Sequence, residues 1–364
     1  MAPSSKSVTV LKCLSSADVV AQNRKYVNDR RKGLIKSLKT KYPKLNSFLM
    51  GGIEANSILC ISALSGGGKS ALSKTIRDSL AELNTDQVFK QYIFNLEMLA
   101  HQQVARSIVS MAKVPIRLLY SVDRPLTDNE MEDLERYYKY LSERDISFIE
   151  TSGNAETIAN TIMYRWVTDC KPTGATLVYE IDHALLIKKD GHDDDQQTIS
   201  KLMLALVDVK KWIATQIDDH GNQGKSIGIV LSQMNREIRK EARMTNADMH
   251  RPDTSCLFGS SAIEQACDYI LFVHQPAKLG LMFYTNAKFP VSMNIEGKIL
   301  SIPYFELVKN RSGEPDITFP MWNKLKYFDF DEMEKAVFEK LHADFITSNC
   351  AQIPILPSQT IIDL

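Results

Sequence analysis

The chain has 364 residues, of which 44% are apolar and 24% are charged, and its formal net charge is zero. This composition predicts a soluble globular protein with one large domain or two modest ones, and no apolar run approaches the roughly 20 residues that a membrane-spanning helix needs. A zero net charge excludes a protein that binds nucleic acid over its whole surface, so any such surface must be a local basic patch.

The amino-terminal segment and the cysteines indicate a cytoplasmic protein. The segment MAPSSKSVTVLKCLSS has no sustained apolar core and no evident cleavage site, so it does not resemble a secretory signal. The six cysteines are scattered, with no CxxC pair and no His/Cys cluster at metal-ligand spacing, which favours reduced thiols. Two basic stretches, residues 23–44 and 234–251, are candidates either for a nucleic-acid surface or for solvated helix faces.

Residues 1–44 are predicted to form an arm with a short amphipathic helix, because apolar residues recur at helical spacing among many charges from Ala17 onward. After Pro43, compact apolar runs of strand length alternate with helix-like segments. The predicted strands are Ser57–Ser62, Val88–Glu97, Ile146–Glu150, Ala175–Asp182, Ser226–Gln233 and Asp268–His274. This alternation predicts an α/β domain over residues 45–330, with a mainly parallel central sheet flanked by helices.

The pattern changes after His274. Residues 299–322 are typical of two strands joined by a turn, which we place at residues 312–315 because Gly and Pro lie there. Residues 331–364 are predicted to form a terminal helix and a loose tail. The sequence therefore predicts three regions: the arm, the large α/β domain, and a carboxyl-terminal helix with its tail.

The segment ISALSGGGKSAL predicts a phosphate-binding loop between a strand and a helix. Residues 63–70, ALSGGGKS, fit the pattern G-x-x-x-x-G-K-[ST] except that Ala63 takes the first glycine position. The glycines let backbone N–H groups converge on phosphate oxygens, Lys69 adds a charge for the β- and γ-phosphates, and the helix turns its positive end toward them. The residues predicted to surround the nucleotide are Ala63, Ser65, Gly66, Gly67, Gly68, Lys69, Ser70 and Ala71.

Polar residues at the ends of three predicted strands are candidates for the chemistry, because parallel sheets bind ligands at the carboxyl ends of their strands. Ser70 offers a hydroxyl to Mg²⁺, and Asp182, at the end of ATLVYEID, is the predicted acidic partner of that ion. Glu180 is the rival, although strand alternation places it deeper on the same face, where a charge is costly. Glu97 is either the base that activates the attacking water or a helix-capping carboxylate, and Gln233 is a candidate sensor of the γ-phosphate.

Together these segments resemble the RecA-like ATPase domain of DnaB-type replicative helicases, from about residue 45 to residue 330. The distinctive parts are NLEM followed by a helix, and the block that runs from SQMNR to AIEQACD. The resemblance implies a P-loop NTPase fold preceded by a short linker helix, and an ATP-dependent motor that unwinds duplex DNA at the replication fork. It also implies ATP and Mg²⁺ as cofactors, ATP sites at the subunit interfaces of a homo-hexamer, and translocation along single-stranded DNA in the 5′ to 3′ direction.

Carried over position by position, the resemblance assigns roles in ATP hydrolysis to Lys69, Ser70, Glu97, Asp182 and Gln233. It adds Lys309 and Arg311, in LVKNRSG, as a basic pair that reaches the ATP site of a neighbouring subunit. Without the family comparison, KNR in a hairpin is more often a solvated turn. Arg106, in HQQVARSI, matches a position that packs near the adenine.

The expected DNA contacts are less typical of the family. The DNA-gripping loop before AIEQ commonly carries an arginine, a glutamate and a glycine, where this chain has LFGSS. Backbone amides can still hold DNA phosphates there, while Phe258 either stacks on a base or packs inward. The residues predicted to contact DNA are Arg236, Phe258, Gly259, Ser260 and Ser261.

Only some 50 residues precede the first predicted strand, so we expect the helical amino-terminal domain that precedes the motor in cellular replicative helicases to be absent. We therefore expect a short, phage- or plasmid-like form in a bacterial or phage-infected cytoplasm, whose recruitment of primase, loader or polymerase differs or is lost. Two other functions stay open: a RecA-like recombination or repair ATPase that forms filaments, and an ATP-regulated loading or assembly protein that does not translocate.

Overall fold

In the computed structural model, the described residues, 13–349, divide into two compact units between Ser37 and Leu38. The first unit contains helix α1 (Ser16–Arg31), which begins with a capping box between Ser15 and Asp18 and has no buried residue. The second unit contains the sheet and all other described helices. None of the helices in the described part of the chain is both long and apolar enough to span a membrane.

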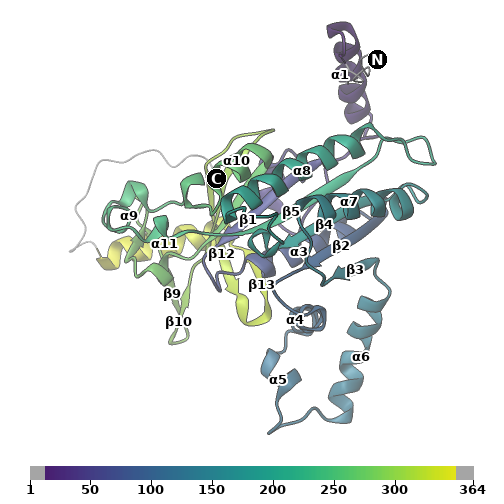
Figure 1. Ribbon diagram of the computed structural model, residues 1–364. Helices are drawn as coiled ribbons and strands as arrows, with labels where there is room; N and C mark the ends of the chain where they lie inside the picture. The colour runs from purple at the N-terminus through teal and green to yellow at the C-terminus, as the bar shows by residue number, and fades with distance from the viewer. Residues whose placement is uncertain (1–12, 350–364) are drawn as a thin grey trace, which may run out of the picture. The chain divides into compact units, whose positions relative to one another are not determined.

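The second unit is built on a nine-stranded sheet with the strand order β13-β12-β11-β6-β1-β5-β4-β2-β3 (Figure 1). Six strands are parallel: β1 (Ser57–Ala63), β2 (Phe89–Asn95), β3 (Ile146–Ile149), β4 (Thr176–Asp182), β5 (Ser226–Gln233) and β6 (Tyr269–His274). Three more strands continue one edge in antiparallel fashion: β11 (Tyr304–Asn310), β12 (Ile317–Lys324) and β13 (Asp329–Glu332). The predicted α/β fold with a mainly parallel sheet is confirmed.

Helices cover both faces of this sheet, which explains why the central strands are apolar along their whole length. On one face, the apolar core joins α7 (Ala155–Arg165), α8 (Asp195–Thr215) and α10 (Ser260–Ala266) to the strands. On the other face, the core joins α2 (Pro43–Phe48) and α3 (Lys69–Leu83) to the strands. The start of α8 is fixed by a capping box between Asp194 and Gln197.

The remaining elements are insertions between the strands. The segment between β2 and β3 contains α4 (Ala100–Ala112), α5 (Ile116–Tyr120) and α6 (Asp128–Ser142), and α9 (Glu241–Thr245) lies between β5 and β6. Between β6 and β11 the chain forms two small hairpins, which consist of β7 (Phe283–Tyr284), β8 (Phe289–Pro290), β9 (Ser292–Ile295) and β10 (Lys298–Ser301). A third apolar cluster packs this insertion against α11 (Lys335–Asn349).

The ends of the large unit differ from the regions predicted from sequence. Leu38 and Tyr42, which we placed in the arm, are buried in the core beneath the sheet, and the backbone of Leu38 pairs with that of Ile53. At the other end, residues 329–332 form an edge strand of the sheet, and Phe338 of α11 packs into the third apolar cluster. The predicted terminal helix is present as α11, whereas residues 38–42 and 329–332 are too short or too charged to show a periodic pattern. Only packing reveals that all three segments belong to the large unit.

Candidate nucleotide-binding site

The glycine-rich loop connects β1 to α3, and Gly67 and Gly68 show why side chains are excluded from the part of it that precedes α3. Gly68 adopts a left-handed backbone conformation with φ of 105°, which a residue with a side chain rarely tolerates. A Cβ on Gly67 would lie 2.7 Å from the carbonyl oxygen of Leu64 and 2.8 Å from the methyl group of Ala63. The methyl group at the first position of the motif therefore fits because the fifth position has no side chain.

The close approach of Gly67 and Ala63 leads to a prediction about the alanine at the first position of the glycine motif. Gly67→Ala should weaken ATP binding about tenfold or more, because crowding of this kind costs about 1–3 kcal/mol. Adding Ala63→Gly to that variant should recover part of the affinity, although not all of it, because the carbonyl of Leu64 remains. Titration of a fluorescent ATP analogue into the four chains of this cycle measures the effect, and equal affinity in all four would contradict the account.

Two carboxylates and a lysine meet where the loop enters α3. The ammonium nitrogen Nζ of Lys69 lies 2.8 Å from Oε2 of Glu97 and 3.4 Å from Oδ1 of Asp182. The hydroxyl of Ser70 donates to Oδ2 of Asp182 at 3.1 Å. Glu97 follows β2 and Asp182 ends β4, so neighbouring parallel strands bring the two carboxylates to the same edge of the sheet. The structure thus gathers four of the residues that the sequence marked for ATP hydrolysis.

The protonation of Glu97 follows from this contact. Burial acts to raise the pKa of Glu97, but the hydrogen bond and charge of Lys69, together with the charges of His183 and Arg106, hold the pKa of Glu97 below its usual value. Nearly half of the side chain is exposed (48%), so a substrate water can reach it. Glu97 is therefore an ionised, accessible carboxylate, as a general base requires.

Glu180 is the alternative to Asp182 as the acidic partner of the ion, and it lies two residues earlier in β4, beside a later turn of α3. It is 1% exposed, accepts a hydrogen bond from Ser73, and lies 3.4 Å from the guanidinium of Arg77. Burial is the main cause of its raised pKa. This geometry gives Glu180 a role in holding α3 against the sheet, and it leaves Asp182 as the carboxylate that Ser70 contacts.

Gln233 also reaches this edge, because β5 pairs with β1 in a register that sets Gln233 beside Ala63. Its side chain is partly exposed, and its backbone carbonyl accepts a hydrogen bond from the N–H of Phe258 at 3.2 Å. The end of β5 thus connects the candidate nucleotide site with the loop that was predicted to contact DNA.

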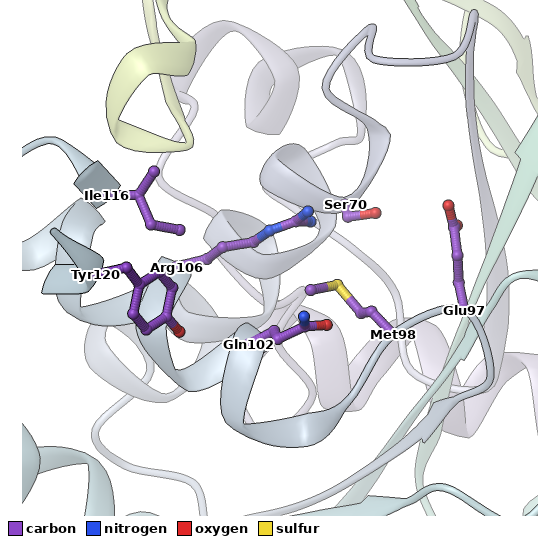
Figure 2. Close-up of a pocket in the computed structure, with 7 residues that line it drawn as sticks. All are labelled: Ser70, Glu97, Met98, Gln102, Arg106, Ile116 and Tyr120. Carbon is purple, nitrogen blue, oxygen red and sulfur yellow. The ribbon is translucent and has the colours of Figure 1, made fainter. Parts of the chain in front are cut away.

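A cavity of about 240 Å³ opens beside Ser70 and Glu97. Figure 2 shows Arg106 extending across this cavity toward Ser70, with Ile116 and Tyr120 on the far side from Glu97. The remaining lining residues are Met98 and Gln102. The guanidinium of Arg106 also lies over the ring of Phe328, 5.0 Å from its centroid. The cavity therefore has a charged end at the loop and an apolar end between α4 and α5.

The predicted basic pair, Lys309 and Arg311, lies in a different cavity of about 490 Å³. This cavity shares no lining residue with the cavity beside Ser70 and Glu97. The guanidinium of Arg311 contacts Oδ1 of Asp268 at 3.0 Å and donates to the carbonyl of Gln265 at 3.2 Å. Lys309 donates to the carbonyl of Glu264. Lys309 and Arg311 therefore lie together against α10, and within one chain the structure does not bring them to the glycine-rich loop.

The predicted DNA loop packs more closely than its sequence suggested. Phe258 is partly buried against the apolar core under α8, which favours the inward orientation over base stacking. Ser261 is exposed and lines the second cavity. Arg236 is exposed in a short 3₁₀ helix (Arg236–Arg239), and Gly259 directly precedes α10, in which Ser260 is the first residue.

The basic stretch at residues 234–251 has fewer available charges than its composition suggests. Arg243 is buried, donates to the carbonyls of Met249 and Arg251, and pairs with Asp253. The guanidinium of Arg251 lies 3.0 Å from the buried carboxylate of Glu306. These two arginines therefore stabilise the fold. The basic side chains that the stretch leaves for a nucleic-acid surface lie mainly among its first residues.

Sequence reasoning missed two residues that contact the loop. The amide Nε2 of Gln275 donates to the carbonyl of Gly67 at 2.8 Å, and Nζ of Lys278 donates to the carbonyl of Gly66 at 2.7 Å. Gln275 directly follows β6, so the strand-end rule that selected Gln233 would also have selected it. Lys278 lies in a short helix that has no comparable signal.

The geometry of this site agrees with a comparison to known families. A family model described as "DnaB-like helicase C terminal domain" matches residues 37–330. The chain belongs to the DnaB-like helicase family. It is an ATP-dependent DNA helicase of the replicative class, which decides against the recombination and loading alternatives.

Solved structures show the same fold in related proteins. A structure whose title describes an ATPase domain is 18% identical, with a TM-score of 0.68 over 89% of this chain and 100% of that one. The structure titled "The Structure Of A DnaB-Like Replicative Helicase And Its Interactions With Primase" is 18% identical, with a TM-score of 0.66 over 89% of this chain and 68% of that one. A search of curated proteins finds no match. At these identities the two structures support the fold of this chain alone. The candidate roles of its site residues depend on the distances and contacts described above.

Proposed function

We propose that this helicase is a ring of identical subunits that hydrolyses ATP at subunit interfaces and translocates along single-stranded DNA. The observation that carries this proposal is the separation of two half-sites in one chain. Lys69, Ser70, Glu97 and Asp182 meet at the loop, whereas Arg311 lies in another cavity beside Asp268. A neighbouring subunit in a closed ring can present its Arg311 to the loop, whereas one chain alone keeps the two half-sites apart.

The residues at the loop fit ATP with Mg²⁺. Ser70 and Asp182 place two oxygen atoms 3.1 Å apart, and among residues 13–349 no group of three or more His, Cys, Asp or Glu is arranged to hold a metal ion by itself. A magnesium ion held by one carboxylate, a hydroxyl and substrate phosphates matches this donor set. When bound, the ion would supply positive charge that offsets the negative charge developing on the phosphates during hydrolysis, and Ser70 and Asp182 would hold it.

The ion pairs at the loop suggest how the residues of this chain act in turn. The phosphates of ATP compete with Glu97 and Asp182 for the ammonium of Lys69, so that nucleotide binding releases Glu97 to accept a proton from the attacking water. Gln233, at the end of β5, orients that water or contacts the γ-phosphate. Arg311 of the adjacent subunit stabilises the charge that develops on the transferred phosphoryl group, and Lys309 supports it.

The proposed DNA path runs past Arg236 and the backbone amides of residues 259–261. Amides at this position bind phosphates without reading sequence, which suits a motor that moves along any strand. Phe258 packs against the core and shapes the loop in this proposal. One solved relative is described with its interactions with primase, and a primase is accordingly the first partner to test.

Unwinding of forked DNA tests the proposal. In the presence of ATP, duplex DNA whose single-stranded tail is a 5′ end should be unwound. Duplex DNA with a 3′ tail of equal length should not, because we propose 5′ to 3′ movement. ATP hydrolysis should rise with single-stranded DNA, and particle mass should correspond to a closed hexamer. The Lys69→Ala chain is the control for contaminating activity. Unwinding from the 3′ tail would reverse the polarity, and a monomer that is fully active would rule out the shared site.

A further inference from the structure

The segment that follows β6 holds the glycine-rich loop through two side chains. Gln275 and Lys278 donate to the carbonyls of Gly67 and Gly66 at 2.8 and 2.7 Å. These two carbonyls are consecutive, so the two donors act on adjacent peptide groups. Both donors come from one short element, η6 (Pro276–Leu279), together with the residue before it.

This element is fixed in place beside the loop. β6 runs parallel to β1, with Val273 paired to Ala63, so the chain leaves both strands at the same point of the sheet. Gln275 is 3% exposed. The N–H of Lys278 donates to the carbonyl of Gln275 at 3.0 Å, and the N–H of Gly280 closes the turn on the carbonyl of Ala277 at 3.1 Å. The two side chains therefore extend from a hydrogen-bonded, partly buried support.

The hydrogen bonds also determine which way the loop's amides point. A trans peptide group directs its C=O and N–H to opposite sides. Gln275 holds the carbonyl of Gly67, so the N–H of Gly68 faces away from Gln275. Lys278 holds the carbonyl of Gly66, and the N–H of the same peptide group, that of Gly67, donates to the carbonyl of Leu64 at 2.7 Å. Both peptide orientations in the middle of the loop are thus set by protein contacts.

We propose that Gln275 and Lys278 are positioning residues that hold the glycine-rich loop in its phosphate-binding shape before ATP arrives. The inference rests on the proposed function only in taking this loop as the ATP site. A loop that is already ordered loses less conformational freedom when it binds, so the two side chains increase affinity for nucleotide. They do not contact the carboxylates of the site in this arrangement, and the chemical step should depend on them little.

The test uses the full chain and compares Lys278→Met with Lys278→Arg. Lys278→Met should raise the Kd of a fluorescent ATP analogue about tenfold, as expected for the loss of one charge-assisted hydrogen bond. The KM for ATP should rise in parallel, while kcat at saturating ATP should stay within about twofold of the original value. Lys278→Arg keeps a donor and should restore most of the affinity. Gln275→Leu should shift Kd and KM in the same direction as Lys278→Met.

The matched control is Lys298→Met, which removes an exposed lysine from the hairpin strand β10, outside the central sheet that carries the loop, and should leave Kd unchanged. If Lys278→Met binds ATP with the original Kd while Lys69→Ala abolishes binding, the positioning role is wrong and the ATP site stands. If Lys69→Ala also binds normally, the loop is not the ATP site and the proposed function fails. A Lys278→Met chain that loses kcat as strongly as affinity would overturn the assignment to positioning.

Discussion

Glu97→Gln should lower kcat for ATP hydrolysis by about 10²–10⁴-fold while ATP still binds. The amide keeps the size and reach of the carboxylate but cannot accept the proton of the attacking water. ATP should bind at least as tightly as before, because Glu97 contacts Lys69 at 2.8 Å and competes with the phosphates for that ammonium. Single-turnover hydrolysis and nucleotide titration measure the two effects separately. Weaker ATP binding with a normal single-turnover rate would assign Glu97 to binding instead.

The pH dependence of kcat/KM provides an independent check on the same residue. Burial acts to raise the pKa of Glu97, but Lys69, His183 and Arg106 together lower it by more, so the net shift of the pKa is downward. A carboxylate with a lowered pKa stays ionised above its usual value of about 4.3, and its stabilising ion pair is lost only as pH falls through the lower folded value. Because kcat/KM reports the free enzyme, Glu97 should cause no loss between about pH 5 and pH 8. An acid limb near neutrality that disappears in Glu97→Gln would contradict the lowered pKa.

Arg311→Ala should lower kcat by about 10³-fold or more, although Arg311 lines a cavity away from its own glycine-rich loop. The loss is large because an arginine at the transferred phosphoryl group offsets charge that forms only during the reaction. Steady-state hydrolysis in the presence of single-stranded DNA measures the effect. Arg136→Ala, which removes an exposed arginine from α6, is the matched control and should keep the original rate.

A mixture of two inactive chains determines which subunit supplies this arginine. In a ring that contains both Arg311→Ala and Lys69→Ala subunits, some interfaces combine an intact loop from the first with an intact arginine from the second. The mixture should therefore hydrolyse ATP faster than either chain alone. A mixture that never exceeds the separate chains would show that Arg311 acts within its own subunit or only in folding.

The central strands could be predicted from sequence because burial on both faces makes each a compact apolar run. The run Ser226–Gln233 matches β5 at both ends, and the other five predicted strands overlap their observed positions. The edge strand β13 could not be predicted, because its sequence, DFDE, is mostly acidic. Asp329 is buried there by contacts with Lys41 and Lys113, which are distant in sequence. Such a strand is stabilised by tertiary ion pairs that no local pattern records.

Candidate site residues could be predicted where they end strands of the parallel sheet. They could not be predicted where the role of a side chain depends on the residues that it contacts in the folded chain. Glu97 and Asp182 follow from strand ends, and the glycine motif indicates Lys69. Charge counting failed at residues 234–251, because it cannot distinguish an arginine in solvent from Arg243, which binds carbonyls inside its own loop. The contact of Lys278 with Gly66 likewise depends on a turn whose position beside the loop is set by tertiary packing.

Strand β6 carries a contact to each half-site at its two ends. Asp268, just before the strand, holds Arg311, and Gln275, just after it, holds the glycine-rich loop. A strand of six residues at about 3.3 Å per residue is about 20 Å long, and inside a sheet it can neither stretch nor shorten. In the proposed ring, the strand would be a spacer of fixed length between the ATP that a subunit binds and the ATP that its Arg311 helps the neighbouring subunit to hydrolyse. If the chain forms this ring, we expect each step of the motor to be a rotation of whole subunits, with the strain concentrated at the interfaces between them.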